Sequence, residues 1–178
     1  IDTAFGYSDS EERIGHGITG VRDRVIIATK TPANDAVTAM EHLNTSLRRL
    51  GTDYIDLWQL HGISSESHFT AVLAPGGAYE AAALAVEQGK VRHIGFSSHN
   101  VDVAGQCVAT GLFATAQVPF NFISDEAAHG LLAQCAAADV GFIGMKPFAG
   151  GAIRDAGLAF RWLMQYPTVL PDPGIERV

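Results

Sequence analysis

The sequence has little cysteine, no long hydrophobic run and no basic residues at its start, and each absence argues against a class of protein. Its two cysteines, Cys107 and Cys135, lie far apart in predicted helices without a Cys-x-x-Cys spacing, which disfavours a disulfide framework or a zinc site. No apolar run approaches the roughly 20 residues of a membrane span. Asp2 and the acidic run 9–12 stand where a signal peptide would need basic residues. We therefore expect a protein of a reducing, cytoplasmic compartment.

Basic residues are also scarce. The chain has 12 Lys and Arg against 19 Asp and Glu, a net charge of −7, and no Lys/Arg cluster. Nucleic acid and anionic membrane surfaces are therefore not expected as partners. With 47% hydrophobic and 17% charged residues, and no repeat or linker, the composition favours one domain with a buried core over residues 1–178. No pattern in the sequence predicts an oligomeric state.

Short hydrophobic runs alternate with longer amphipathic stretches, which predicts an α/β fold built from β-α-β units around a parallel sheet. The runs are nearly continuous, as in strands covered on both faces. The predicted strands are Val25–Lys30, Tyr54–Leu60, Arg92–Ser97, Thr115–Pro119, Gly141–Lys146 and Thr168–Pro171, with a further short strand at Ile1–Ala4.

Helices are predicted between these strands. Their limits follow from apolar stripes and from the glycines and prolines that stop them. They are a short helix opening at Ser10 and longer ones at Asp35–Leu50, Ala78–Gln88, Val101–Thr110, Asp125–Ala138 and Ala152–Tyr166. A complete (β/α)8 TIM barrel typically needs about 250 residues. The chain therefore predicts an incomplete barrel.

In such barrels the chemistry lies at the carboxyl ends of the strands, where this sequence places ionisable residues. Asp2 lies on the first short strand with Tyr7 beyond it, Lys30 ends the next strand, and His61 follows the third. These groups suit proton transfer to a carbonyl oxygen, with Tyr7 as general acid, Lys30 stabilising its phenolate, Asp2 balancing the lysine and His61 orienting the substrate. Asp2, Lys30 or His61 alone is more typical of a structural ion pair or a satisfied polar group, but their joint occurrence at three successive strand ends favours the catalytic interpretation. A metal-dependent hydrolase using Asp2, His61 and His99 is a further alternative.

Several motifs, in this order, resemble the aldo-keto reductase family along essentially the whole chain. They are Ile1-Asp2-Thr3-Ala4-Phe5-Gly6-Tyr7, Ser10-Glu11-Glu12-Arg13-Ile14-Gly15, Ala28-Thr29-Lys30, Leu47 through Leu57, Leu60-His61 and Gly89 through Ser97. The resemblance implies that Asp2, Tyr7, Lys30 and His61 are a catalytic tetrad. It also implies hydride transfer from NADPH, with NADH as the alternative, to a small aldehyde or ketone, without a metal.

The resemblance further implies a nicotinamide pocket. Ser97 and Ser98 stand where the family usually has Ser-Asn, and Gln117 matches the family's other ligand of the carboxamide. At Ser98 the chain departs from the pattern, so His99 or Asn100 is an alternative ligand. A second interpretation of this loop is a simple helix start with Asn100 as the N-cap.

Four more residues are assigned to the cofactor by the same resemblance. Met145 stands where many relatives stack an aromatic ring on the nicotinamide, and a methionine can pack against a ring. Lys146, Phe148 and Gly150 belong to a glycine-containing loop that is expected to approach the pyrophosphate. The alternative is an ordinary strand-to-helix turn.

The family's first strand and its C-terminal cofactor-binding segment have no counterpart here, so we expect a fragment, strands 2 to 8 of the family barrel, with unpaired strand edges that make it unstable or weakly active alone. A different function on the same fold is an NADPH-binding, redox-sensing regulatory subunit with little turnover.

Overall fold

The computed structural model describes residues 1–123 and 126–174, with the side chains of all of these except 126 and 127. Six parallel strands alternate with helices along the chain. The chain forms two compact units, Ile1–Phe96 and Ser97–Val178. A single domain over residues 1–178 stays a prediction.

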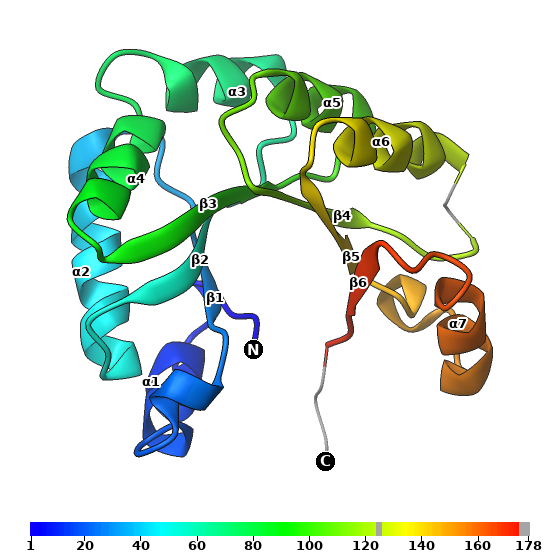
Figure 1. The fold of residues 1–178 in the computed structure, drawn as a ribbon, viewed down its shortest axis with the longest axis horizontal. Helices are drawn as coiled ribbons and strands as arrows, with labels where there is room; N and C mark the ends of the chain where they lie inside the picture. Colours follow the sequence, from blue (N-terminus) through cyan, green and yellow to red (C-terminus); the bar gives the residue numbers. More distant parts are fainter. Residues whose placement is uncertain (124–125, 175–178) are drawn as a thin grey trace. The chain divides into compact units, whose positions relative to one another are not determined.

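The first unit has three parallel strands, with β2 paired to β1 on one side and to β3 on the other (Figure 1). Every residue of β2 is buried, including the polar Asp56 and Gln59, because helices cover the strands, and this explains why the strand is nearly continuous in apolar residues. The elements are α1 (Ser10–Gly17), a 3-10 turn (Arg22–Arg24), β1 (Ala28–Thr31), α2 (Ala36–Leu50), β2 (Ile55–Leu60), α3 (Glu66–Leu73), α4 (Ala78–Glu87) and β3 (Val91–Ser97).

The second unit repeats this arrangement, with β5 paired in parallel to both β4 and β6. An aromatic cluster forms its core, in which the ring of Phe120 contacts Phe142, Trp162 and Tyr166 at centroid distances of 5.0–5.4 Å. The elements are α5 (Val101–Ala109), β4 (Thr115–Pro119), α6 (Glu126–Ala137), β5 (Gly141–Met145), a 3-10 turn (Ala149–Gly151), α7 (Ala156–Leu163) and β6 (Val169–Asp172).

Most predicted elements are confirmed, but two strand predictions need correction. The strand predicted from Val25 begins only at Ala28, because the amide of Ile27 donates to the carboxylate of Asp56 instead of to a neighbouring strand. The segment Ile1–Ala4 forms a single bridge, between Asp2 and Ala28. Its backbone nevertheless runs beside β1, since the amides of Thr3 and Phe5 donate to the carbonyls of Ala28 and Lys30.

The helix predictions missed one helix and gave wrong limits for another. Helix α3 was not predicted, although Ser65 caps it by accepting from the amide of His68. Helix α7 begins at Ala156 rather than Ala152, because a 3-10 turn precedes it and Asp155 is the N-cap, and it ends at Leu163 rather than Tyr166. The predicted start of the preceding helix at Asp125 lies outside the described residues.

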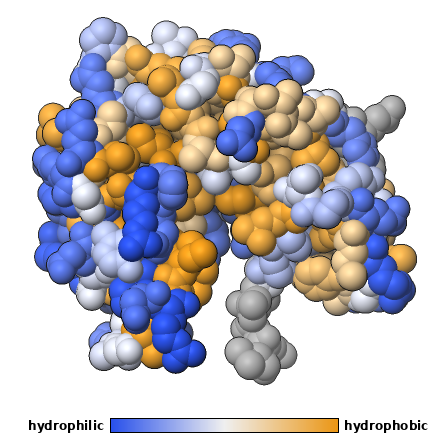
Figure 2. All heavy atoms as spheres, viewed as in Figure 1, coloured by the Kyte–Doolittle hydropathy of each residue, from blue (hydrophilic) through white to orange (hydrophobic). Residues whose placement is uncertain are grey.

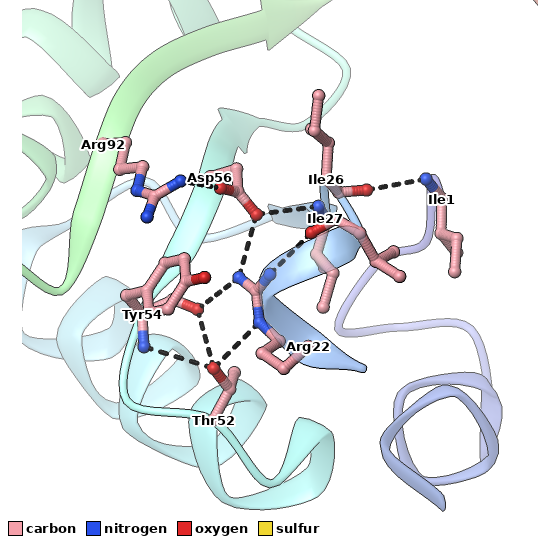
Figure 3. A network of polar contacts seen from close by, with 9 residues as sticks. Ile1, Arg22, Ile26, Ile27, Thr52, Tyr54, Asp56 and Arg92 are labelled. Atoms are coloured by element: carbon pink, nitrogen blue, oxygen red, sulfur yellow. Dashed lines mark hydrogen bonds and ion pairs between the residues drawn. The ribbon is translucent and has the colours of Figure 1, made fainter. Parts of the chain in front are cut away.

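A cluster of charged and aromatic side chains joins the amino ends of the first unit's strands (Figure 3). The carboxylate of Asp56 accepts from Arg22 at 2.8 Å, from Arg92 at 2.6 Å and from the amide of Ile27 at 2.9 Å. Both guanidinium groups also lie over the ring of Tyr54, 4.0 and 4.2 Å from its centroid. We call Arg22, Tyr54, Asp56 and Arg92 the Asp56 cluster. It fixes the end of the strands that is remote from His61.

The surface mixes polar and apolar side chains. On the face drawn in Figure 2, hydrophilic and hydrophobic residues are interspersed. Large apolar side chains such as Ile26 in the first unit and Met164 in the second are exposed, as is common when they occur singly. Among the described residues, no helix has the length and apolar character needed to cross a lipid bilayer.

Candidate active site

A buried lysine lies at the centre of the candidate site. Lys30, on β1, has a side chain only 2% exposed, and its ammonium group forms an ion pair with the carboxylate of Asp2. The same ammonium donates to the backbone carbonyl of Thr3 at 2.8 Å. A charge removed from water in this way is tolerated because an opposite charge and hydrogen bonds replace its hydration. The predicted pairing of Lys30 with Asp2 is present.

Asp2 receives a second contact from β2. The register pairs Lys30 with Gln59, and the amide Nε2 of buried Gln59 lies 3.4 Å from the other oxygen of Asp2. The two carboxylate oxygens therefore have different donors. Sequence reasoning gave Gln59 no role, although its place two residues before His61 in a buried strand was a usable signal.

Tyr7 and His61 complete the group. The ring of Tyr7 is edge-on to that of His61 with centroids 5.9 Å apart, and the ammonium of Lys30 lies 5.5 Å from the Tyr7 ring centroid. His61 immediately follows β2, and its amide donates to the carbonyl of Thr31 at 2.9 Å. Tyr7 is 49% exposed while Lys30 is buried, so the phenol faces solvent with the charged pair behind it. The structure thus brings Asp2, Tyr7, Lys30 and His61 together.

A buried glutamate supports this group from outside. Glu11, on α1, accepts from the hydroxyl of Thr29 at 2.7 Å and from Arg49 of α2 at 3.2 Å. Arg49 also donates to the carbonyl of Phe5 at 3.2 Å. These contacts tie the segment before Tyr7 to α2 and the strand of Lys30 to α1, and the contact of Arg49 with Glu11 joins the two helices. They were missed because the partners are 18 and 38 residues away from Glu11 in sequence.

The predicted carboxamide ligands lie in the second unit, where Ser97, Ser98 and Gln117 are all buried. The amide of Ser98 donates to the carbonyl of Gln117 at 3.0 Å. The hydroxyl of Ser98 donates to the carbonyl of Asn100 and accepts from its amide. Asn100 is the N-cap of α5, as one interpretation of the sequence expected. The side chain of Ser98 therefore bonds within the turn. Of the three predicted carboxamide ligands, Gln117 is the one that carries a side-chain amide, and it is buried.

The loop after β5 is a compact turn. Met145 ends the strand and is half-buried, and exposed Lys146 follows with φ +55°. The ring of Phe148 packs edge-on against Phe160 of α7 at 5.7 Å, and Gly150 has φ +66°. The amides of four loop residues donate to carbonyls of the same loop: Ala149, Gly151, Ala152 and Ile153. Of the predicted cofactor residues here, Lys146 is an exposed positive charge, and Phe148 anchors the loop to α7.

Lys146 acts electrostatically on His99, in the loop that follows β3. Burial lowers the pKa of His99 below its ordinary value, and the charge of Lys146 lowers it further. His99 is therefore neutral at neutral pH.

Within the part of the chain that the structure describes, no three His, Cys, Asp or Glu side chains gather as a metal site would require. Both cysteines are free and buried. The described residues give the hydrolase alternative no ligand set.

Comparison with known proteins gives consistent matches. The model of the Aldo/keto reductase family matches residues 1–165. The chain is 33% identical over 147 residues to aldo-keto reductase YhdN of Bacillus subtilis, covering 74% of this chain and 42% of that protein. It is 32% identical over 165 residues to methylglyoxal reductase YeaE of Escherichia coli, covering 87% of this chain and 55% of that protein. The chain thus spans about half the length of these curated relatives.

Solved structures match as well. The crystal structure of an aldo/keto reductase from Klebsiella pneumoniae in complex with NADP and acetate superposes with a TM-score of 0.81 and 29% identity, covering 98% of this chain and 69% of that one. The predicted fold class, part of a parallel β/α barrel, is confirmed.

Proposed function

The chain belongs to the aldo/keto reductase family, and from this premise we propose that it carries the catalytic group of an NADPH-dependent reductase of small aldehydes or ketones. The observation that carries the proposal is the buried ion pair of Lys30 and Asp2 beside the exposed phenol of Tyr7. A lone structural ion pair would not need a tyrosine and a histidine at its open side.

The four side chains divide the work of protonating a carbonyl oxygen. Tyr7 gives its phenolic proton to that oxygen and becomes a phenolate, which the ammonium of Lys30 stabilises across the 5.5 Å to the ring. Asp2 holds the ammonium group of Lys30 in place, and Gln59 holds Asp2. His61, whose ring meets Tyr7 edge-on, orients the carbonyl oxygen by hydrogen bonding.

When bound, NADPH would supply the hydride for the carbonyl carbon, and Tyr7 supplies the proton for the oxygen. The second unit fits this cofactor in two respects: a buried amide at Gln117 suits a carboxamide, and Lys146 suits a phosphate. NADPH is favoured over NADH because the Klebsiella relative is described in complex with NADP. A cytoplasmic location remains part of the proposal, supported by the two free cysteines.

The test is the decrease of NADPH absorbance with a panel of aldehydes, measured on the full natural chain that carries this sequence. Methylglyoxal is the first substrate to try, because one relative is a methylglyoxal reductase. Tyr7→Phe is expected to lower kcat by roughly 10²–10⁴-fold, the range of general acid catalysis, with the Kd of NADPH nearly unchanged. Tyr79→Phe, which removes a phenolic hydroxyl on α4, is the matched control and should keep wild-type kcat.

Two outcomes would count against the proposal. Equal kcat values for Tyr7→Phe and wild type would remove Tyr7 as the acid. Tight NADPH binding without reduction of any aldehyde would instead favour the redox-sensing regulatory subunit.

A further inference from the structure

Gln117 and Asp172 are joined across the second unit's strands. The amide Nε2 of Gln117, on β4, donates to the carboxylate of Asp172 at the end of β6, at 2.7 Å. Strand β5 lies between the two in the pairing order, and Met145 pairs with Asp172 in register. Gln117 is 2% exposed, and its backbone carbonyl accepts from the backbone amide of Ser98. Asp172 therefore reaches the predicted carboxamide ligand from a separate strand.

A carboxylate constrains an amide in one specific way. An ionised carboxylate only accepts hydrogen bonds, whereas a glutamine side chain has a donating NH2 and an accepting carbonyl oxygen. The contact therefore sets the amide with its nitrogen toward Asp172 and its oxygen Oε1 at the other end. Burial strengthens the constraint, because a flipped amide would direct its oxygen at a carboxylate away from water. The hydrogen bond to Asp172 thus fixes the orientation of the Gln117 side-chain amide.

We propose that Asp172 is a positioning residue that holds Gln117 as the hydrogen-bond acceptor for the carboxamide NH2 of the nicotinamide cofactor, and so selects cofactors whose ring carries an amide. The inference rests on the proposed function, since it takes Gln117 as a carboxamide ligand. It adds a residue with no place in the tetrad or among the predicted ligands. The competing explanation is that the contact only ties β6 to β4.

Cofactor chemistry separates the two explanations. The nicotinamide carboxamide has an NH2 donor, whereas the acetyl group of the 3-acetylpyridine analogue of NADPH keeps the carbonyl and lacks the NH2. An oriented acceptor at Gln117 distinguishes the two cofactors, and a purely structural contact does not. The preference, Kd of the analogue divided by Kd of NADPH, reports the orientation and is independent of turnover.

The experiment measures both Kd values by quenching of tryptophan fluorescence in the full natural chain. Wild type is expected to prefer NADPH by roughly five- to tenfold, the fold-change of one neutral hydrogen bond. Asp172→Asn has nearly the same shape but allows both amide orientations. It should bring the preference to about twofold or less while the Kd of the analogue stays near the wild-type value. Retained binding of the analogue also shows that the variant is folded.

Two further variants serve as controls. Asp172→Glu keeps a carboxylate and should retain the preference. In a Gln117→Ala background, Asp172→Asn should change the preference no further, because the residue acts through Gln117. Equal weakening of both cofactors by Asp172→Asn would overturn the inference and leave a structural contact. Failure of wild type to bind NADPH would overturn the proposed cofactor use, and this inference with it.

Discussion

His42 lies flat against Phe5. Their ring centroids are 3.8 Å apart and the ring planes differ by 19°. The Nδ1 atom of His42 also lies 2.9 Å from the hydroxyl of Thr31, whose backbone carbonyl accepts from the amide of His61. The side chain of His42 thus contacts both the segment that leads to Tyr7 and the end of β1, which binds the backbone amide of His61. Burial lowers the pKa of His42, despite the nearby charges of three acidic residues, so the ring is neutral at neutral pH.

His42→Ala is therefore expected to lower kcat without removing any group of the tetrad. Small displacements of reacting groups cost up to about a hundredfold in rate, so we expect a loss of roughly ten- to a hundredfold. His42→Phe keeps a ring against Phe5 and loses only the contact to Thr31, and should fall between wild type and the alanine variant. Steady-state kcat with the NADPH Kd checks this. Unchanged kcat in His42→Ala would show that Tyr7 and His61 are positioned without it.

Glu11 should contribute measurably to stability. Glu11→Ala removes the acceptor of the buried Thr29 hydroxyl, while Arg49, 29% exposed, can turn to water. We expect a loss of about 1–3 kcal/mol in the free energy of unfolding, the cost of an unsatisfied buried group. Glu12→Ala is the control: that side chain is 57% exposed and 3.8 Å from Arg49, so its change should stay within about 0.5 kcal/mol. Urea unfolding measures both, and similar losses in the two variants would contradict the assignment.

The Asp56 cluster predicts a dependence of stability on acid. Burial alone would raise the pKa of Asp56, but the amide of Ile27 and the charges of Arg22 and Arg92 together hold it below its ordinary value of 3.8. The unfolded chain then takes up the proton more readily than the folded one. The stabilisation is complete above the ordinary value and is lost as pH falls through the lower, folded value.

Asp56→Asn should accordingly be less stable than wild type at neutral pH, and the difference should shrink as the pH is lowered below 3.8. Unfolding curves recorded over a pH series provide the measurement. Asp53→Asn, an exposed residue of the preceding loop, serves as the control. If the difference in stability between Asp56→Asn and wild type were constant over the whole acid range, the charge of Asp56 would not contribute to folding stability.

Two glycines of α1 should respond in opposite ways to alanine. A Cβ at Gly15 would lie 2.4 Å from the carbonyl oxygen of Arg49 and 2.9 Å from the carbonyl carbon of Leu50, so α1 and α2 would have to separate. Gly15→Ala should cost about 1–3 kcal/mol. A Cβ at Gly17 meets no atom within 4 Å, and Gly17→Ala should be neutral or stabilise by up to about 1 kcal/mol. Thermal unfolding checks the pair. Equal effects would show that the helices do not pack this closely.

The parts of the fold that follow from local pattern were predictable. Strand β2 is a nearly continuous apolar run, and Gly51 ends α2 in the left-handed conformation that glycine favours. Helix α3 was missed because its polar start, Ser65 to Ser67, is typical of a loop as well. The early start assigned to β1 failed because a distant carboxylate, that of Asp56, takes the amide of Ile27.

In the candidate site too, residues marked by a local pattern were predicted, and residues that act through distant contacts were not. Asp2, Tyr7, Lys30 and His61 were found because strand ends and a family resemblance both pointed to them, and their catalytic roles stay predictions. The supporting residues Glu11, His42 and Asp172 were not found. Each acts through a partner at least 11 residues away, on another element, and no spacing in the sequence announces such a contact.

The burial of Lys30 has a consequence for chemical labelling. The chain has three lysines, at positions 30, 90 and 146. Lys146 is exposed, Lys90 is half-buried, and Lys30 is shielded behind Asp2 and Thr3. An amine-selective reagent therefore finds a graded series of targets in the folded chain, with Lys146 reacting first and Lys30 last. The reactivity of the Lys30 amine reports, by mass spectrometry alone, whether this side chain stays buried behind Asp2 and Thr3.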